Sequence, residues 1–329
     1  MSSIRPKYLK PGDKIMLVAP AWFASQTVIQ DAASAVIAAG FTPVTPTGLD
    51  ERDNQFGGSS EYPGGSDAHR AELLNSAFRD PSIRAVFALR GGYGSGRLLP
   101  LLDTTAYISD PKWIIGFSDI TTLHAWSTNL GIASLHAPVA NFLNSTLSSD
   151  VDALWSSLRG DFSITSDVKI TGGNLSVLYS LLGTPYFPDV SGSHLFLEDL
   201  DEYLYHIDRM FLAFKLAGIF EKADGLIIGT FEDIKDNTIA DGRSKDNPFG
   251  LTVEEIALAD LSIDTGFTSP SVQTTIQQGD LISLAWNSDS RVTAQKVWMN
   301  DKLFANMLPG QNIARIVPAY LKNGQAVTI

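Results

Sequence analysis

Short apolar segments alternate with helical patterns over the first 140 residues of the chain. Residues 14–20 and 84–89 are apolar runs of strand length, and residues 27–39 form an Ala-rich segment with helical spacing. Four further segments continue this alternation, with strands predicted at 41–46 and 112–116 and helices at 66–80 and 119–129. Strands that alternate with helices are typical of α/β domains with a largely parallel sheet. We therefore expect such a domain over residues 1–145.

The second half of the chain has a different pattern. Residues 146–171 are polar and rich in Ser, and we interpret them as a connection, because 329 residues are enough for about two domains. Residues 172–329 begin with helical and strand patterns. From about residue 275 they change to short alternating runs typical of β-hairpins, with turns at Asn300-Asp301 and Asn323-Gly324. We expect a mixed α+β C-terminal domain that ends in a small β unit.

Charge and composition exclude several classes of protein. The chain has 24 Lys and Arg against 36 Asp and Glu, a net charge of −12, and no basic patch, so we expect no nucleic-acid partner. It has no Cys, which excludes disulfides, thiolate zinc sites and a cysteine nucleophile. No run approaches the roughly 20 apolar residues of a membrane span, and the N-terminus lacks a secretory signal pattern. These features predict a cytoplasmic protein without a membrane partner.

A glycine-rich cluster follows the predicted strand at residues 84–89. It reads Arg90-Gly-Gly-Tyr-Gly-Ser-Gly-Arg97. Glycines let the backbone approach a ligand and direct N–H groups at an anion, so the cluster is either a tight strand-to-helix turn or part of an oxyanion hole. Its spacing matches neither the phosphate loop nor the dinucleotide fingerprint, which argues against a nucleotide-binding protein.

A serine stands at the next strand-to-helix turn, in Gly116-Phe-Ser-Asp119. A serine in such a turn is exposed at the carboxyl edge of the sheet, near the positive end of a helix, as in a nucleophile elbow. The closing glycine of the usual elbow pattern is absent, and Ser-Asp is also an ordinary helix N-cap. Both interpretations of Ser118 stay open on this segment alone.

A third cluster, residues 195–202, is an apolar strand that ends in acidic residues, before a long amphipathic helix predicted over residues 201–219. It places Glu198 and Asp199 at the end of the strand. A carboxylate there could orient a histidine, although strand-end acids are more often solvated or cap the next helix. We find no His-x-x-x-His pattern or acidic loop and predict no metal site and no cofactor.

The three clusters, in this order, resemble the serine peptidase family of LD-carboxypeptidases and microcin C immunity peptidases. The resemblance runs from Leu9 to about Gly266. Besides the clusters it includes Leu9-Lys-Pro-Gly-Asp-Lys-Ile-Met-Leu-Val-Ala-Pro-Ala21, His136-Ala-Pro-Val139, Gly172-Gly-Asn-Leu-Ser176, Gly183-Thr-Pro185 and Ile207-Asp-Arg-Met210. The joint order of these segments is more specific than any one of them.

The resemblance implies a two-domain serine carboxypeptidase with a cleft between its domains and, as a further expectation, a homodimer. Ser118 falls on the family's nucleophile, and Glu198 on the acid of its Ser-Glu-His triad. The backbone amides of Gly92 and Asp119 correspond to the oxyanion donors. The family cleaves an amide bond next to a free carboxylate and releases a terminal D-amino acid from cytoplasmic muropeptides in peptidoglycan recycling. Its immunity branch cleaves a peptide-nucleotide antibiotic.

The sequence departs from the family at the histidine of the triad. The family's Gly-Phe-x-x-Gly-His segment corresponds here to residues 266–271, which places Ser271 at the histidine position. The five histidines of the chain are His69, His124, His136, His194 and His206. A serine hydroxyl is no general base near neutral pH. Either His206 or His124 is a substitute base, or the protein is a catalytically impaired relative that binds a peptide or peptide-nucleotide.

Overall fold

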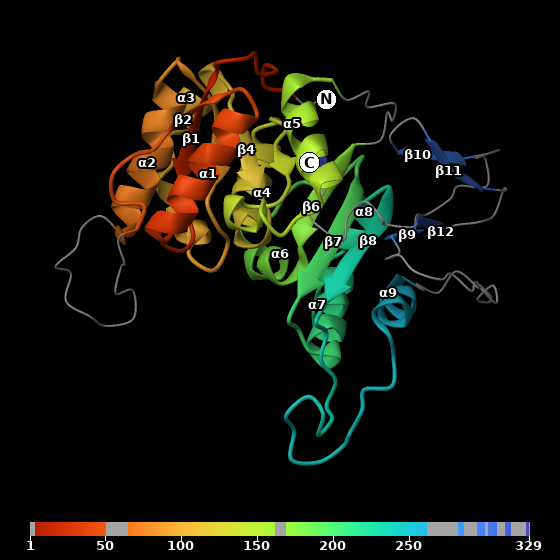
Figure 1. The fold of residues 1–329 in the computed structure, drawn as a ribbon. Coiled ribbons are helices and arrows are strands. Elements are labelled where there is room, and N and C mark those ends of the chain that lie inside the picture. Colours follow the sequence, from red (N-terminus) through yellow and green to blue (C-terminus); the bar gives the residue numbers. More distant parts are fainter. Residues whose placement is uncertain are drawn as a thin grey trace. The chain divides into compact units, whose positions relative to one another are not determined.

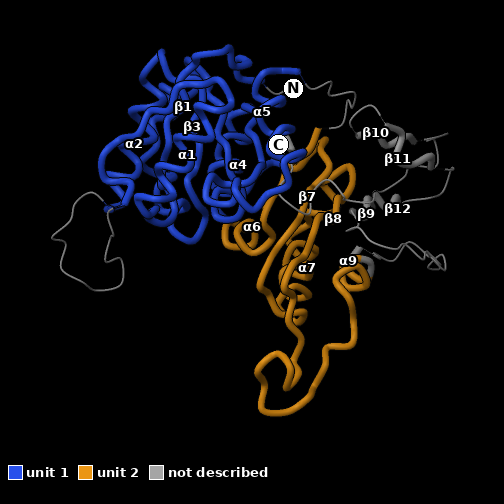
Figure 2. Tube along the Cα trace, viewed as in Figure 1, with its two compact units in different colours: residues 1–163, 183–189, 323–329 blue, residues 164–182, 190–322 orange. Residues whose placement is uncertain are grey.

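The computed structural model describes residues 4–50, 65–161 and 169–261, and the backbone of five short strands beyond them. The described chain divides into two compact units (Figure 2). The first unit comprises residues 1–163, 183–189 and 323–329, and the second comprises residues 164–182 and 190–322. No helix in the described part of the chain has the length and apolar character needed to cross a membrane.

In the described part of the chain, the first unit contains a six-stranded sheet in the order β13-β5-β4-β3-β1-β2. Figure 1 labels β1, β2 and β4 of this sheet. Its strands are β1 (Lys14–Val18), β2 (Thr42–Val44), β3 (Ile83–Ala88), β4 (Trp113–Gly116), β5 (Leu135–His136) and β13 (Val327–Thr328). All pairs among β1 to β5 are parallel, and β13 pairs antiparallel with β5 at the edge. The predicted α/β domain with a largely parallel sheet is confirmed.

The α-helices described in the first unit are α1 (Gln26–Ala38), α2 (Asp67–Arg79), α3 (Thr104–Ser109), α4 (Thr121–Asn129) and α5 (Ser148–Arg159). Short 3-10 helices span η2 (Ser95–Leu101), η3 (Ser118–Ile120) and η4 (Ala140–Phe142). Ser25 and Ser66 cap α1 and α2, because their hydroxyls accept hydrogen bonds from the Val28 and His69 amides. These caps explain why both helices begin where the sequence predicts a start.

The segment interpreted as an interdomain connection contributes to the core of the first unit. Within residues 146–171, α5 buries Leu154, Trp155 and Leu158 in the cluster formed by α1 and the sheet. The Trp155 ring packs edge-on against Phe87 of β3 at 5.9 Å. The exposed face of α5 is rich in Ser, so the average composition of the segment is polar although one face of the helix is apolar. The first unit therefore continues through residue 163.

The second unit contains a mixed five-stranded sheet in the order β12-β9-β8-β7-β6. Its strands are β6 (Ile170–Asn174), β7 (His194–Leu200), β8 (Gly225–Glu232), β9 (Ile282–Ala285) and β12 (Ile313–Ile316). β6, β7 and β8 are parallel, whereas β9 and β12 run antiparallel to their neighbours. β10 (Gln295–Met299) and β11 (Lys302–Met307) pair antiparallel on either side of Asn300-Asp301. This arrangement confirms the mixed domain, while Asn323-Gly324 lie outside the described residues.

The helices described in the second unit are α6 (Leu175–Leu181), α7 (Leu204–Leu216), α8 (Ile219–Lys222) and α9 (Val253–Leu261). α7 is shorter than the helix predicted over residues 201–219. Asp201 has a φ of 60° and Tyr203 is extended at the N-cap, so the helix begins only at Leu204. The buried face of α7 includes Phe211 and Phe214, which pack against Phe220 of α8.

The backbone of β7 at Phe196 lies close to Gly172 of β6, and we expect Gly172→Ala to disrupt this pairing. A Cβ atom at Gly172 would lie 1.9 Å from the Phe196 carbonyl oxygen, and its φ of 151° is unfavourable for other residues. Since a backbone atom cannot yield locally, we expect a loss of about 3 kcal/mol in the free energy of unfolding, measured by urea denaturation.

Gly192→Ala is the matched control for this prediction. Gly192 has a φ of 67° and nothing within 4 Å of its Cβ position, so the substitution isolates the backbone cost, about 1 kcal/mol. Equal losses for the two variants would contradict the predicted clash.

Candidate active site

Ser118 lies at the carboxyl edge of the first unit's sheet, two residues after β4 and at the start of η3. β4 lies between β3 and β5, so the loops after these three parallel strands meet at this edge. Ser118 has a φ of 59°, a left-handed conformation that is uncommon for a residue with a side chain. Such strain at a strand-to-helix turn is a feature of nucleophile elbows.

Hydrogen bonds to Gly116 hold this turn in place. The Gly116 carbonyl accepts from the Ala137 amide at 3.0 Å and lies 2.8 Å from Nε2 of His124. Because a carbonyl only accepts, Nε2 of His124 is the donor and Nδ1 accepts from the Ser134 hydroxyl at 2.8 Å. The strained position of Ser118 is therefore supported from α4 and from the segment after β5.

The glycine-rich loop after β3 passes beside Ser118. A Cβ atom placed on Gly91 would lie 3.1 Å from Ser118 Cβ and 3.2 Å from Ser118 Oγ. The absence of a side chain at Gly91 thus lets the backbone of this loop approach the hydroxyl. The glycine-rich cluster and the turn that carries Ser118 are therefore neighbours in the fold. Gly92 directly follows Gly91 in this loop.

Ser95 joins the same loop to the residue after Ser118. Its amide donates to Oδ2 of Asp119 at 2.8 Å, and its hydroxyl lies 2.7 Å from Oδ2 and 2.6 Å from the Asp119 carbonyl oxygen. The same hydroxyl also bonds Thr122 Oγ1 at 2.7 Å. Burial raises the pKa of Asp119, and the hydrogen bonds from Ser95 oppose this rise. The side chain of Asp119 therefore braces the loop, while its backbone follows Ser118.

Arg70 lies beside the same loop, since a Cβ atom placed on Gly94 would lie 2.9 Å from its Nη1. Its buried guanidinium donates to the carbonyls of Pro20 and Ala21 and pairs with Asp67. Asp67 in turn pairs with Arg97 at the end of the glycine-rich cluster. These contacts connect residues that are far apart in the sequence, and no local pattern singles out Ser95 or Arg70. Ser95 could have been suggested by its place within the glycine-rich cluster, whereas Arg70 lies in a separate predicted helix that carries no such signal.

Glu198 lies on β7 in the second unit, next to Asn174 of β6 in the strand register. The register between β7 and β8 shifts between Leu197 and Asp199, so Glu198 stands at an irregularity of the sheet. Its side chain is 9% exposed. Burial and the nearby charge of Asp199 raise the pKa of Glu198 to about 8, against a hydrogen bond with Asn174. The carboxyl group is therefore mostly protonated at neutral pH.

Asp199, the other acid that the sequence singled out, has a structural position. It accepts hydrogen bonds from Asn174 Nδ2 at 2.8 Å, from the Ser176 amide at 2.9 Å and from the Leu200 amide at 2.9 Å. Asn174 also caps α6. Asp199 therefore fixes the turn from β6 into α6.

The raised pKa of Glu198 predicts a pH-dependent stability. In the unfolded chain this group ionises near its ordinary pKa of 4.5, whereas in the folded chain it stays protonated up to about 8. The contribution of Glu198 to the free energy of unfolding is therefore fully present below pH 4.5 and is lost as the pH rises towards 8. We expect the free energy of unfolding, relative to Glu198→Gln, to fall by about 1 kcal/mol per pH unit over this window.

Denaturation followed by circular dichroism at several pH values tests this prediction. Glu221→Gln, on the exposed surface of α8, is the matched control and should keep the wild-type slope. A Glu198→Gln profile parallel to that of the wild type would contradict the prediction.

Two models of known protein domains match most of the chain. The model described as the LD-carboxypeptidase N-terminal domain matches residues 15–137, and the one described as the LD-carboxypeptidase C-terminal domain matches residues 168–267. The chain belongs to the LD-carboxypeptidase family. The sequence resemblance is thereby confirmed. Both segments with Ser118 and Glu198 fall within the matched regions.

Named relatives agree with this assignment. A putative carboxypeptidase of Synechocystis is 33% identical over 246 residues, which cover 70% of this chain and 77% of that protein. A probable murein peptide carboxypeptidase of Bacillus subtilis is 32% identical over 254 residues, covering 70% and 75%. A solved structure of the protein MccF with glutamyl sulfamoyl guanosine has a TM-score of 0.64 at 21% identity, covering 79% and 87%. These relatives support a carboxypeptidase, and the MccF structure supports the fold.

The histidines of this LD-carboxypeptidase family member leave the base unassigned. Both ring nitrogens of His124 are hydrogen-bonded, and burial lowers its pKa to about 4. His136, which follows it at 5.9 Å between rings, has its pKa lowered to about 3 by burial and by His124. His206 lies in the second unit, where Nδ1 contacts Glu202 at 2.6 Å. Ser271 lies outside the described residues. His124 and His136 are thus placed as neutral structural groups.

The described residues contain no group of three or more His, Asp or Glu side chains that could hold a metal ion.

Proposed function

We propose that this protein is a serine-type carboxypeptidase that cleaves the amide bond next to a terminal D-amino acid in cytoplasmic muropeptides. One observation carries the proposal: a strained serine at a strand-to-helix turn, with a glycine backbone against its hydroxyl, in an LD-carboxypeptidase family chain. The carboxypeptidase names of the relatives support the reaction class. The D-amino acid and the recycling role come from the family resemblance.

In the proposed mechanism, Ser118 Oγ attacks the carbonyl carbon of the scissile amide. The hydroxyl proton passes to a base, and the negative charge on the carbonyl oxygen is stabilised by the amides of Gly92 and Asp119. The proton then goes to the leaving nitrogen as the C–N bond breaks, which leaves an acyl-serine. Water hydrolyses this ester and restores the hydroxyl. The bracing of the loop by Ser95 and Arg70 supports donors that are fixed before the reaction.

Glu198 takes the role of the orienting acid in this proposal. A carboxylate that orients a base must be ionised, and the pKa of Glu198 near 8 means that a positively charged partner would be needed to ionise it at neutral pH. Ser271, at the position of the family histidine, cannot supply that charge. The proton acceptor for Ser118 is therefore a group other than the family's usual histidine.

A catalytically impaired relative is the second candidate. Two observations favour this candidate: no histidine follows residue 206, and the raised pKa of Glu198 keeps its carboxyl group predominantly neutral. Such a protein would bind a peptide or a peptide-nucleotide without turnover. MccF, whose fold this chain shares, has been solved with glutamyl sulfamoyl guanosine.

The two candidates differ in turnover. The first predicts release of D-alanine from a murein tetrapeptide with an L,D-linked terminal residue, and no release from the peptide ending in L-alanine. The second predicts binding of the tetrapeptide or of glutamyl sulfamoyl guanosine by calorimetry, without release of product. Failure of both release and binding would contradict both candidates.

A further inference from the structure

Arg90 is a half-buried cation beside the candidate nucleophile. It lies two residues after the last residue of β3, Ala88. A Cβ atom placed on its chain neighbour Gly91 would lie 3.2 Å from Ser118 Oγ, so this part of the loop lies beside the Ser118 side chain. The Nε atom of Arg90 is buried and has no hydrogen-bond partner among the described residues. No ion pair of Arg90 occurs in that part of the chain either.

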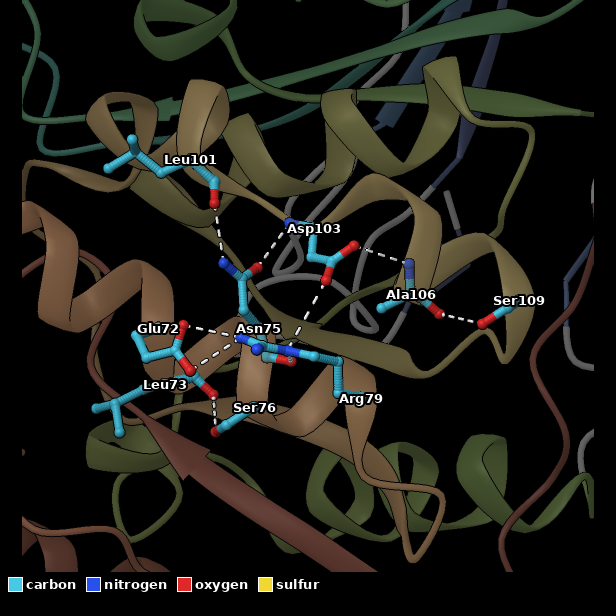
Figure 3. A network of polar contacts seen from close by, with 9 residues as sticks. All are labelled: Glu72, Leu73, Asn75, Ser76, Arg79, Leu101, Asp103, Ala106 and Ser109. Atoms are coloured by element: carbon cyan, nitrogen blue, oxygen red, sulfur yellow. Dashed lines mark hydrogen bonds and ion pairs between the residues drawn. The ribbon is translucent and has the colours of Figure 1, made fainter.

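The other arginines with described side chains all have partners. Arg79, for example, reaches both carboxylate oxygens of Glu72 on the exposed face of α2, at 2.9 and 2.8 Å (Figure 3). The remaining pairs are Arg5 with Tyr8, Arg70 and Arg97 with Asp67, Arg84 with Asp110, Arg159 with Asp161, Arg209 with Tyr205 and Arg243 with Tyr203. Arg90 alone in this set lacks one.

An unpaired guanidinium in a partly buried position is unfavourable, because it stays charged at every physiological pH and loses part of its hydration. An anionic ligand that binds to the guanidinium would offset this cost. The chain has a net charge of −12, so its overall charge repels an anionic ligand, and a cation at the binding site is needed to attract one.

A second polar atom without a partner lies on the neighbouring loop. The side-chain oxygen of Asn141, in η4, is buried and has no hydrogen-bond partner among the described residues. The Asn141 amide donates to the Leu89 carbonyl at 2.9 Å, so the two loops are joined next to Arg90. The edge of the sheet around Ser118 therefore offers both a cationic donor and a neutral acceptor that the described protein groups do not use.

We propose that Arg90 binds the free carboxylate of the residue that the enzyme releases. The inference rests on the proposed function, because it assigns the substrate's end to a residue next to Ser118. A guanidinium presents a planar pair of N–H donors that matches the two oxygens of a carboxylate. The terminal carboxylate is also the group that distinguishes a carboxypeptidase substrate from an internal peptide bond. Arg90 would thus set the preference for a chain end, while Asn141 accepts an N–H group of the same ligand.

Binding to the Ser118→Ala protein tests the proposal without turnover. Calorimetry compares a murein tetrapeptide ending in D-alanine with the same peptide ending in D-alaninamide. We expect the free acid to bind about 10- to 100-fold more tightly, as for a hydrogen bond to a charged group. Adding Arg90→Gln should remove this difference, because it should lower the affinity for the free-acid peptide and leave the affinity for the amide peptide unchanged. Arg90→Lys should retain part of it, because it keeps the charge without the paired donors.

Arg79→Gln, in the same Ser118→Ala background, is the matched control and should keep the full preference for the acid. Thermal unfolding separates a structural role: Arg90→Gln should melt at the same temperature as its parent or higher, since it removes an unpaired charge, whereas loss of a structural contact would lower the melting temperature. Equal affinity for acid and amide with Arg90 intact, or no binding of either peptide, would overturn the proposal. A preference for the acid without any hydrolysis by the wild type would uphold it and contradict the proposed function instead.

Discussion

Ser118→Ala removes labelling by a fluorophosphonate probe and lowers muropeptide hydrolysis by about 10⁴-fold or more. The expected loss is this large because the hydroxyl forms the covalent intermediate and no other group replaces it. The φ of 59° at Ser118 and the glycine backbone beside its Oγ make this the serine of the described structure that is best placed to react. Gel fluorescence of the labelled protein and a D-alanine assay measure the two effects.

Ser34→Ala is the matched control for this experiment. Ser34 lies on the exposed face of α1, where its hydroxyl donates to the Gln30 carbonyl. It should keep both the labelling and the hydrolysis of the wild type. Equal labelling of the wild type and of Ser118→Ala would remove Ser118 from the mechanism.

Glu198→Ala should lower kcat/KM by about 10³-fold while the far-ultraviolet circular dichroism spectrum stays that of the wild type. The expected loss is smaller than at Ser118 because an orienting acid acts through another group. The fold should persist, since removing a buried carboxyl whose pKa is near 8 takes away a group that burial disfavours in its charged form.

Asp199→Ala gives the contrasting result. Its carboxylate accepts from Asn174, Ser176 and Leu200, so its loss should lower the unfolding midpoint of the second unit. A Glu198→Ala enzyme with wild-type kcat/KM would remove Glu198 from the mechanism, whatever the stability of the variants.

The elements that the sequence predicted well are those set by local periodicity. The parallel sheet follows from buried apolar runs that alternate with helices, and the starts of α1 and α2 follow from serine caps. The same local logic predicted a serine at the turn after β4. It also predicted antiparallel pairing on either side of Asn300-Asp301.

The features that the sequence did not predict depend on contacts between distant residues. α5 looked like part of a polar connection because its exposed face is rich in serine, and only its packing under β3 shows it to be core. The left-handed φ of Ser118 and the approach of Gly91 to its hydroxyl arise from tertiary packing. Two further features likewise depend on how the strands are arranged in the sheet: the hydrogen bonds from Ser95 to Asp119, and the Nε of Arg90, which has no partner among the described residues.

The same contacts reduce the number of candidates for the substitute base, which the sequence left open. In the sequence, His124 is a candidate because it lies about two turns into the helix after Ser118. The structure engages both of its nitrogens with Gly116 and Ser134, so it acts as a support for the turn that carries Ser118. Spacing along a helix indicated proximity correctly, but it could not indicate which groups the imidazole bonds.

Release of D-alanine from an L,D-linked murein tetrapeptide, compared between the wild type and Ser118→Ala, tests the central proposal most directly. The account predicts release that depends on Ser118, which would establish a working peptidase whose base differs from the family's usual histidine. Binding of the tetrapeptide without release by the wild type, or release that persists in Ser118→Ala, would contradict it.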